Sequence, residues 1–275
     1  MRPPERRAAG YDLGMAPQKP TPRPAGPPHV SVWVAPPKER RRGAAPGGLS
    51  RQRIVRAAIE LLDAEGEQRF SMRRLATELG VTPMSVYWYV DNKSELLELA
   101  LDEALGEMSI PPLPEDGDWR AHLRVMAHEY RAFYRRHLWA TRVAGEVLPL
   151  GPNALFFSTS ALSAAVRTGL PQPEYAGALG LIFQFVYGFA TSEAQQLIRV
   201  RESGLSEEEW EREFIGLARR VDERFVEQAE LINPPDLGQG MAEKRDRFFA
   251  DGLEIALDGV EARIGRAAES RSERG

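Results

Sequence analysis

The chain has 275 residues, no cysteine and a formal net charge of −4. This length allows a substantial core and two folded units, whereas the absence of cysteine excludes disulfides, thiol catalysis and thiolate-bound metals and fits a reducing cytoplasm. Residues 1–48 carry nine Lys and Arg against three Asp and Glu, so the acidic excess lies in the remainder. The overall charge therefore does not exclude nucleic acid as a partner.

Residues 1–48 are predicted to be a disordered Pro/Arg-rich tail, because they hold eleven of the 21 prolines and show little periodicity. SVWV (31–34) is an apolar island and PKERRR (37–42) is a basic run. The first thirty residues lack the apolar region of a signal peptide. Two interpretations stay open. In the first, the segment is an arm that reaches DNA phosphates or the minor groove. In the second, it is a solvated tail, or an upstream stretch included by a misplaced start codon, for which Met15 is an alternative start.

Four helices are predicted over residues 49–108, which we interpret as a DNA-binding domain. Each begins after a residue that favours the N-cap position, and the first two end at a glycine. The caps are Ser50, Ser71, Thr82 and Asn92, and the glycines are Gly66 and Gly80.

Residues 71–93 (SMRRLATELGVTPMSVYWYVDNK) contain two of these helices around one tight turn. In the second, only Val86 and Val90 are spaced as buried anchors, four residues apart. The neighbouring side chains are predicted to point outward: Met84, Ser85, Tyr87, Trp88 and Tyr89. A helix that exposes so much aromatic surface usually has a partner, and a helix-turn-helix unit supplies one in the major groove of double-stranded DNA.

The remainder has helical periodicity and no strand pattern, so the predicted fold class is all-α. A break at 110–118 precedes a larger helical domain, 118–266, which we interpret as a ligand-binding and dimerisation domain. Its predicted helices span 119–137, 153–168, 173–201, 207–232 and 241–265. The uncharged stretch 175–192 includes Gln184 and several glycines, so we expect a buried helix and no membrane association.

Three segments resemble the tetracycline-repressor (TetR) family of bacterial regulators: LSRQRIVRAAIELLDAEG (49–66), SMRRLATELGVTPMSVYWYVDNKSELL (71–97) and RFFADGLEIALDGVEARI (247–264). The aromatic triplet followed by V-x-N-K-x-x-L is the most specific part. The last segment is similar to the close of the branch that contains the tetracycline repressors themselves. The resemblance covers about 50–265 and is tighter in its first quarter.

The resemblance implies roles in DNA binding. It places Arg73 on the helix before the turn, Tyr87 and Lys93 at phosphates, and the following residues on the recognition surface: Thr82, Met84, Ser85, Trp88 and Tyr89. The family more often has His at position 89 and a polar residue at 84, so its sequence preference does not transfer. The recognition helix offers no bidentate Arg or Asn, and we expect readout through thymine methyls and DNA shape.

Aromatic side chains in the second domain suggest a ligand cavity. The candidates are Met126, Tyr130, Tyr134, His137, Phe156, Phe183, Gln184 and Tyr187, although each also fits an ordinary core position. Met126 and Tyr130 fall where the resemblance places drug contacts.

The tetracycline repressors hold a magnesium–drug chelate with histidines, and the corresponding positions here are Ser109 and about Ala144. Hard cations need oxygen or imidazole ligands. We therefore expect no metal, no other cofactor and an inducer other than tetracycline.

The last helix carries a bulky stripe and a stripe of small residues, which suggests a homodimer built with the 173–201 helix. The predicted dimerisation residues are Phe249, Gly252, Leu253, Ala256, Gly259 and Val260. The alternative is a helix that packs only within its own chain.

These features favour a cytoplasmic, dimeric repressor that a small apolar or amphipathic ligand releases from a palindromic operator. An activator or a regulator without a ligand would use the same residues. A small-molecule carrier is disfavoured by the intact 71–93 segment. An enzyme is disfavoured because the chain has no GxSxG, phosphate loop or HExxH.

Overall fold

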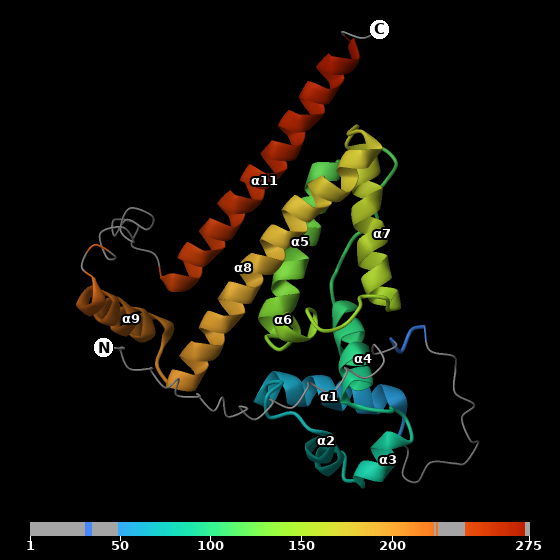
Figure 1. Cartoon of the computed structure of the whole chain (residues 1–275), viewed down its shortest axis with the longest axis vertical. Coiled ribbons are helices and arrows are strands. Elements are labelled where there is room, and N and C mark those ends of the chain that lie inside the picture. Colours follow the sequence, from blue (N-terminus) through green and yellow to red (C-terminus); the bar gives the residue numbers. More distant parts are fainter. Residues whose placement is uncertain (1–30, 35–48, 223, 225–239, 273–275) are drawn as a thin grey trace, which may run out of the picture. The chain divides into compact units, whose positions relative to one another are not determined.

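The computed structural model describes residues 31–34, 49–222, 224 and 240–272, and every regular element in these ranges is helical, which confirms the all-α fold class. In chain order the elements are α1 (Arg51–Glu65), α2 (Met72–Glu78), α3 (Pro83–Tyr87), α4 (Lys93–Leu105), α5 (Trp119–Arg136), α6 (Ala140–Val143), α7 (Pro152–Arg167), η2 (Gln172–Glu174), α8 (Tyr175–Ser203), α9 (Glu207–Val221) and α11 (Met241–Ser272) (Figure 1).

The four predicted N-caps all form. Ser50, Ser71 and Thr82 accept through their hydroxyls, and Asn92 through its amide oxygen, from the backbone N–H three residues later. Each bond satisfies one of the N–H groups that the first turn of a helix leaves unpaired. Gly66 and Gly80 have φ of 79° and 67°, the positive-φ conformation that favours glycine, as predicted.

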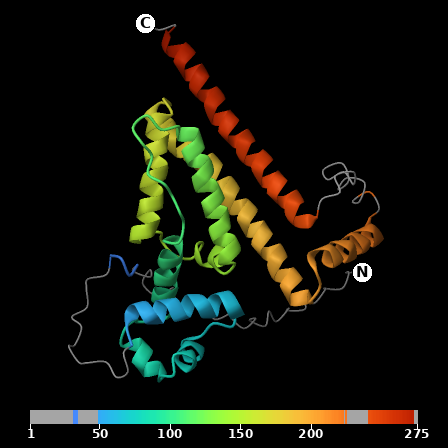
Figure 2. The same ribbon diagram turned by 180° about the vertical axis from the view of Figure 1, so that it is seen from behind.

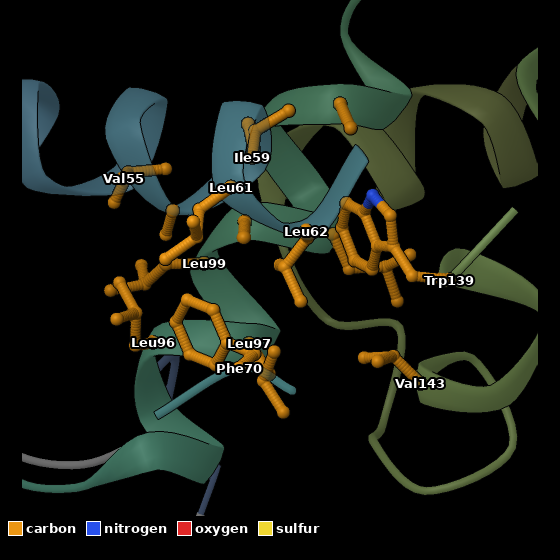
Figure 3. Packing of buried hydrophobic residues seen from close by; sticks show 14 of the residues in the cluster. Val55, Ile59, Leu61, Leu62, Phe70, Leu96, Leu97, Leu99, Trp139 and Val143 are labelled. Atoms are coloured by element: carbon orange, nitrogen blue, oxygen red, sulfur yellow. The ribbon is translucent and has the colours of Figure 1, made fainter. Parts of the chain in front are cut away.

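The first hydrophobic core lies among α1, α2, α3 and α4. Figure 3 shows the part of it that α1 and α4 form with Phe70, Trp139 and Val143. Leu62 of α1 and Leu96 of α4 are fully buried in it. Trp139 and Val143, from the α6 region, pack into the same core, so it extends beyond residue 108. The division at 108 and 118 into two domains stays a prediction.

The second core lies among α5, α7, α8 and α11, which run beside one another in both views (Figures 1 and 2). Its fully buried members include Met126, Ile182, Phe249 and Leu253. α4 joins the two cores, since Asp102 near its end accepts from the N–H of Ala154 at 3.0 Å in the first turn of α7.

α8 is buried on one side only. Ile182 and Val186 face the second core and Ala190 the first, while Leu181 and Gln184 are exposed. A single chain therefore does not bury this helix on all sides, although the sequence led us to expect that it would. No helix in the described part of the chain is long and apolar enough to cross a membrane.

Four residues of the predicted tail, Ser31–Val34, are placed against α4. The hydroxyl of Ser31 and the N–H of Val32, the latter at 3.1 Å, both donate to the buried Glu98 carboxylate. Val32 and Trp33 pack on the first core. Disorder throughout 1–48 is therefore wrong for this tetrapeptide, because its apolar side chains find a surface that composition alone cannot reveal. The remaining tail residues lie outside the described ranges.

The last two helices differ from their predicted bounds. The described part of the 207–232 helix is α9, which ends at Val221 and buries none of its residues. The predicted capping box at its start forms between Ser206 and Glu209. α11 runs to Ser272, past the expected end at 265.

Candidate nucleic-acid interface and ligand site

α3 exposes an apolar and aromatic surface, as predicted. Val86 and Val90 lie buried beneath it, whereas Met84 and Trp88 are each 68% exposed and Tyr87 is 43% exposed. Large apolar side chains gathered on one exposed surface are typical of an interaction site.

Tyr89 does not share this surface, and the prediction that it points outward is wrong. Its ring packs on the first core, and its hydroxyl donates to the carbonyl oxygen of Leu49 at 2.7 Å. The reason is local: α3 ends at Tyr87, so the helical spacing that placed position 89 outside no longer applies.

Thr82 and Ser85 present hydroxyls at the start of α3. Their oxygens lie 3.0 Å apart, and Thr82 Oγ1 also accepts from the N–H of Ser85 at 3.3 Å. Thr82 is exposed and Ser85 is half-buried. Both hydroxyls are positioned at the same end of α3 and could donate to a phosphate oxygen.

The two candidate phosphate cations differ in their surroundings. Arg73 is exposed on α2. Lys93 Nζ lies 2.6 Å from Glu67 Oε1 and 5.7 Å from the centre of the Phe70 ring. Glu67 is a residue that sequence reasoning missed, because it lies 26 positions before Lys93 and no local pattern links the two.

Four of the predicted ligand residues belong to one aromatic cluster: Tyr130, Tyr134, Phe183 and Tyr187. The hydroxyls of Tyr130 and Tyr134 are 2.7 Å apart, and the ring centres of Tyr134 and Tyr187 are 5.6 Å apart. Tyr187 donates to the carbonyl oxygen of Thr141 at 2.9 Å. Met126, one turn before Tyr130 on α5, is fully buried.

Burial raises the pKa of Tyr130 and of Tyr134, for each of which it is the largest cause. Both phenols therefore stay neutral across the physiological range. A neutral phenol can donate one hydrogen bond and accept others, so the cluster offers polar contacts within an aromatic wall.

Three other predicted ligand residues lie elsewhere. Phe156 and Gln184 are exposed, on α7 and α8. His137 is buried at the end of α5 and bonded to two carboxylates, Asp63 and Glu107. The prediction that these residues line one cavity with the tyrosines is wrong. Helical spacing shows which residues share one face of a helix, but it does not show which other helix packs on that face.

Phe157 is the aromatic residue of α7 that joins the cluster. Its ring centre lies 5.0 Å from that of Tyr130 and 5.0 Å from that of Phe183. The buried residues Ala154 and Ala161 lie three before and four after it, so their spacing could have selected Phe157 over Phe156.

The two positions compared with metal ligands have ordinary surroundings. Ser109 N–H donates to Glu129 Oε2 at 2.9 Å, and Ala144 directly follows α6. Within the described ranges, no group of three His, Cys, Asp or Glu is arranged to hold a metal ion. The absence of metal and cofactor stays a prediction.

Most predicted dimerisation residues face their own chain. Phe249, Leu253, Ala256 and Val260 are buried in the second core, so their assignment to a surface is wrong. The physical reason is that the bulky stripe of α11 covers α5 and α8 of the same chain.

The small residues of α11 are divided between its two faces, since Ala256 is buried and Gly259 is exposed. Gly252 packs so closely on Phe185 that an added Cβ would lie 2.5 Å from the ring, while Gly259 has open space around it. Ile255, between them, is 72% exposed. On α8, an uncharged exposed stripe recurs every three or four residues: Gly177, Leu181, Gln184, Gly188, Ser192 and Gln195.

Two family models match the chain. The model described as bacterial regulatory proteins, tetR family, matches residues 54–100, and the model described as tetracyclin repressor-like, C-terminal domain, matches residues 111–264.

Similar proteins include bacterial repressors. The HTH-type transcriptional repressor DrrR1 of Streptomyces coeruleorubidus is 36% identical over 228 residues, covering 81% of each chain. The tetracycline repressor protein class C of Escherichia coli is 31% identical over 106 residues, covering 38% of this chain and 48% of that protein.

Among solved structures, apo ActR of Streptomyces coelicolor has a TM-score of 0.61 at 30% identity, and the match covers 80% of this chain and 99% of the ActR chain. ActR in complex with actinorhodin has a TM-score of 0.63, also at 30% identity, covering 80% and 100%.

Proposed function

The chain belongs to the TetR family of bacterial transcriptional regulators, and we propose that it is a cytoplasmic, dimeric repressor released from palindromic DNA by a small aromatic ligand. The single observation that carries DNA binding is the exposed surface of α3, with Met84, Tyr87 and Trp88 outward over two buried valines. A surface of this kind is costly to leave in water and fits the major groove. The proposal includes no catalytic activity.

The proposed DNA contacts follow from exposure. Met84 and Trp88 reach base edges and thymine methyls, and Arg73, Thr82, Ser85, Tyr87 and Lys93 hold phosphates. Tyr89 supports the surface from within, by its bond to Leu49. Because phosphate contacts carry no sequence information, most of the affinity is expected to depend on salt.

The aromatic cluster around Tyr130 supports the ligand class. Tyr130, Tyr134, Phe157 and Phe183 offer ring faces, and two neutral phenols among them offer polar contacts. This chemistry fits a planar aromatic molecule with hydroxyl or carbonyl groups. The similar protein ActR has been solved in complex with actinorhodin, so this compound is included in the release test below.

The dimer is proposed to form through the outward faces of α8 and α11. Gly177, Leu181 and Gly188 on α8 and Ile255 and Gly259 on α11 provide exposed, uncharged positions that let helices approach closely. Two chains related by a two-fold axis would place their α3 helices about 34–36 Å apart, one turn of DNA.

The deciding experiment selects bound duplexes from a random-sequence library and then tests release by planar aromatic compounds that carry hydroxyl or carbonyl groups, actinorhodin among them. We expect a pseudo-palindromic sequence to be selected, and at least one such compound to release it. Failure to retain any duplex at low salt would refute the DNA-binding function. A reporter measured with the gene deleted separates a repressor from an activator, since loss of a repressor raises expression.

A further inference from the structure

His137 is buried between two carboxylates that come from different parts of the chain. Its Nδ1 lies 2.9 Å from Asp63 Oδ1, near the end of α1, and its Nε2 lies 3.0 Å from Glu107 Oε2, just after α4. The side chain itself follows α5 and is only about 4% exposed. Three helices therefore meet at one imidazole.

Only one protonation state satisfies this geometry. A carboxylate accepts hydrogen bonds, and a neutral imidazole has one N–H, so it can donate to one carboxylate only. The imidazolium has two N–H groups and can donate to both Asp63 and Glu107. Trp139 Nε1 also donates to Asp63 Oδ1 at 2.7 Å, which fixes the position of that carboxylate.

Burial opposes protonation of His137, but the hydrogen bonds and charges of Asp63 and Glu107 together outweigh it. The pKa of His137 consequently lies above its usual value. This is the reverse of His122 and His128, whose pKa values lie below the usual one because of burial and, secondarily, nearby arginines.

Other charged groups line the same open depression: Arg56 and Glu60 of α1, Glu103 of α4, Arg136 of α5 and Arg201 of α8, while α7 contributes the uncharged Asn153. Arg136 Nε lies 3.8 Å from Glu107 Oε2, and Arg201 Nη1 donates to the carbonyl oxygen of Asp63 at 3.4 Å. Arg136 therefore shares the Glu107 carboxylate with His137, whereas Arg201 contacts only the backbone of Asp63 and leaves its carboxylate to His137.

The location connects the two cores. On one side of His137, α1 lies next to α2 and α3, the proposed DNA-reading helices (Figure 1). On the other side, α5 contains Tyr130 and Tyr134. The ring of Phe133 lies 4.9 Å from that of Tyr134 and 5.6 Å from that of His137. A shift of α5 caused by a ligand at the tyrosines would therefore reach His137 through packed rings.

We propose that His137 is a positioning residue that locks α1 to α5 in the DNA-binding arrangement, and that operator affinity is highest while its imidazole is protonated. This inference rests on the proposed function. The lock holds below the pKa of His137 and is lost as pH rises through it, because the neutral ring gives up one of the two bonds.

The first test is a pH titration of the histidine ring protons of the full-length protein by NMR. We expect one histidine to titrate above the ordinary value, and its signal to be absent in His137→Gln. If the signal that disappears belongs to a ring already neutral at pH 6, the lock is refuted.

The second test measures affinity for a library-selected duplex between pH 6 and 9 at constant salt. For the wild type we expect affinity to fall about fivefold or more as pH rises through the pKa of His137. Glu107→Gln removes one charged partner from a half-exposed position, so the fall should begin at lower pH. His137→Gln should remove the fall, and His128→Gln, at a histidine of α5 that contacts neither Asp63 nor Glu107, serves as the matched control with the wild-type profile.

The outcomes separate the two proposals. A wild-type protein that binds no selected duplex overturns the proposed function and the lock together. A protein that binds DNA with the same pH profile in the wild type, Glu107→Gln and His137→Gln refutes the lock alone. A merely structural role would lower affinity without moving the pH at which it changes.

Discussion

The contacts that Lys93 makes within the protein determine how easily it can bind a DNA phosphate. It begins α4, where the N-terminal end of the helix also favours an anion, yet its ammonium is held by Glu67 at 2.6 Å. The pair is half-exposed, and ion pairs that reach solvent contribute little to stability, roughly 0–1 kcal/mol. A DNA phosphate can therefore compete with Glu67 for Lys93 at small cost.

This competition predicts opposite effects of two substitutions. Lys93→Ala should weaken binding to every duplex alike and lower the salt slope by about one, because one phosphate contact is lost. Glu67→Gln should strengthen binding to every duplex, since it frees the ammonium. Affinities measured by fluorescence anisotropy over a salt series check both. A change of base preference in either variant would contradict the phosphate role.

Tyr89 and Tyr87 make a matched pair with opposite expected effects. Tyr89→Phe removes the hydroxyl bonded to Leu49 and should lower the free energy of unfolding by about 1 kcal/mol. Tyr87→Phe should leave unfolding unchanged but weaken DNA binding, because its hydroxyl is exposed and assigned to a phosphate. Urea unfolding and DNA affinity separate the two. Equal effects of both variants on stability would show that the assignment of the inner and outer tyrosine is incorrect.

At the scale of elements, α4 links segments that lie far apart in the chain. Its side chains enter the first core, its Glu98 receives Ser31 and Val32, and its Asp102 accepts from the start of α7. The carboxylates of Glu98 and Asp102 are both buried, so each depends on its donors for stability. α4 thereby links the Ser31–Val34 segment, the DNA-reading helices and the sensing helices.

The contact of Ser31 with Glu98 predicts a measurable contribution from the N-terminal segment. Ser31→Ala removes one donor to a buried carboxylate and should lower the free energy of unfolding by about 1.5–3 kcal/mol. Ser94→Ala, at an exposed position of α4, is the control and should have little effect. Chemical denaturation of the full chain measures both. If Ser31→Ala is as silent as the control, the segment does not dock on α4.

At the scale of the whole molecule, the two faces of α11 have different roles. The bulky stripe packs in the core of its own chain together with Ala256, whereas Ile255 and Gly259 are exposed beside the uncharged stripe of α8. An uncharged surface of this length along two neighbouring helices is typical of an interface.

This arrangement predicts that the dimer depends on the outer stripes. Leu181→Glu or Ile255→Glu should give monomers at micromolar concentration in sedimentation velocity, since each would bury a charge opposite its symmetry mate. Val125→Glu, at an exposed position of α5, is the control and should remain dimeric. A dimer that tolerates both glutamates would place the interface elsewhere.

Much of the helical framework could be predicted because its signals are local. Ser50, Ser71, Thr82 and Asn92 cap the helices they were expected to cap, and Gly80 adopts its left-handed turn. Side-chain bonds to the nearest N–H groups depend only on residues three positions apart. The exposure of α3 followed for the same reason, since Val86 and Val90 sit one turn apart.

The sequence by itself determined the helices, the helix-turn-helix surface and membership of the family, because caps, spacing and motif letters are properties of neighbouring residues. Only the tertiary structure decided that Tyr89 turns inward, that His137 joins two carboxylates instead of a cavity, and that Phe249 and Leu253 belong to their own chain's core. Periodicity reports that a helix has an apolar face. Which helix covers that face is settled by packing between residues far apart in the chain, as in the pairing of His137 with Asp63, and no local pattern records it.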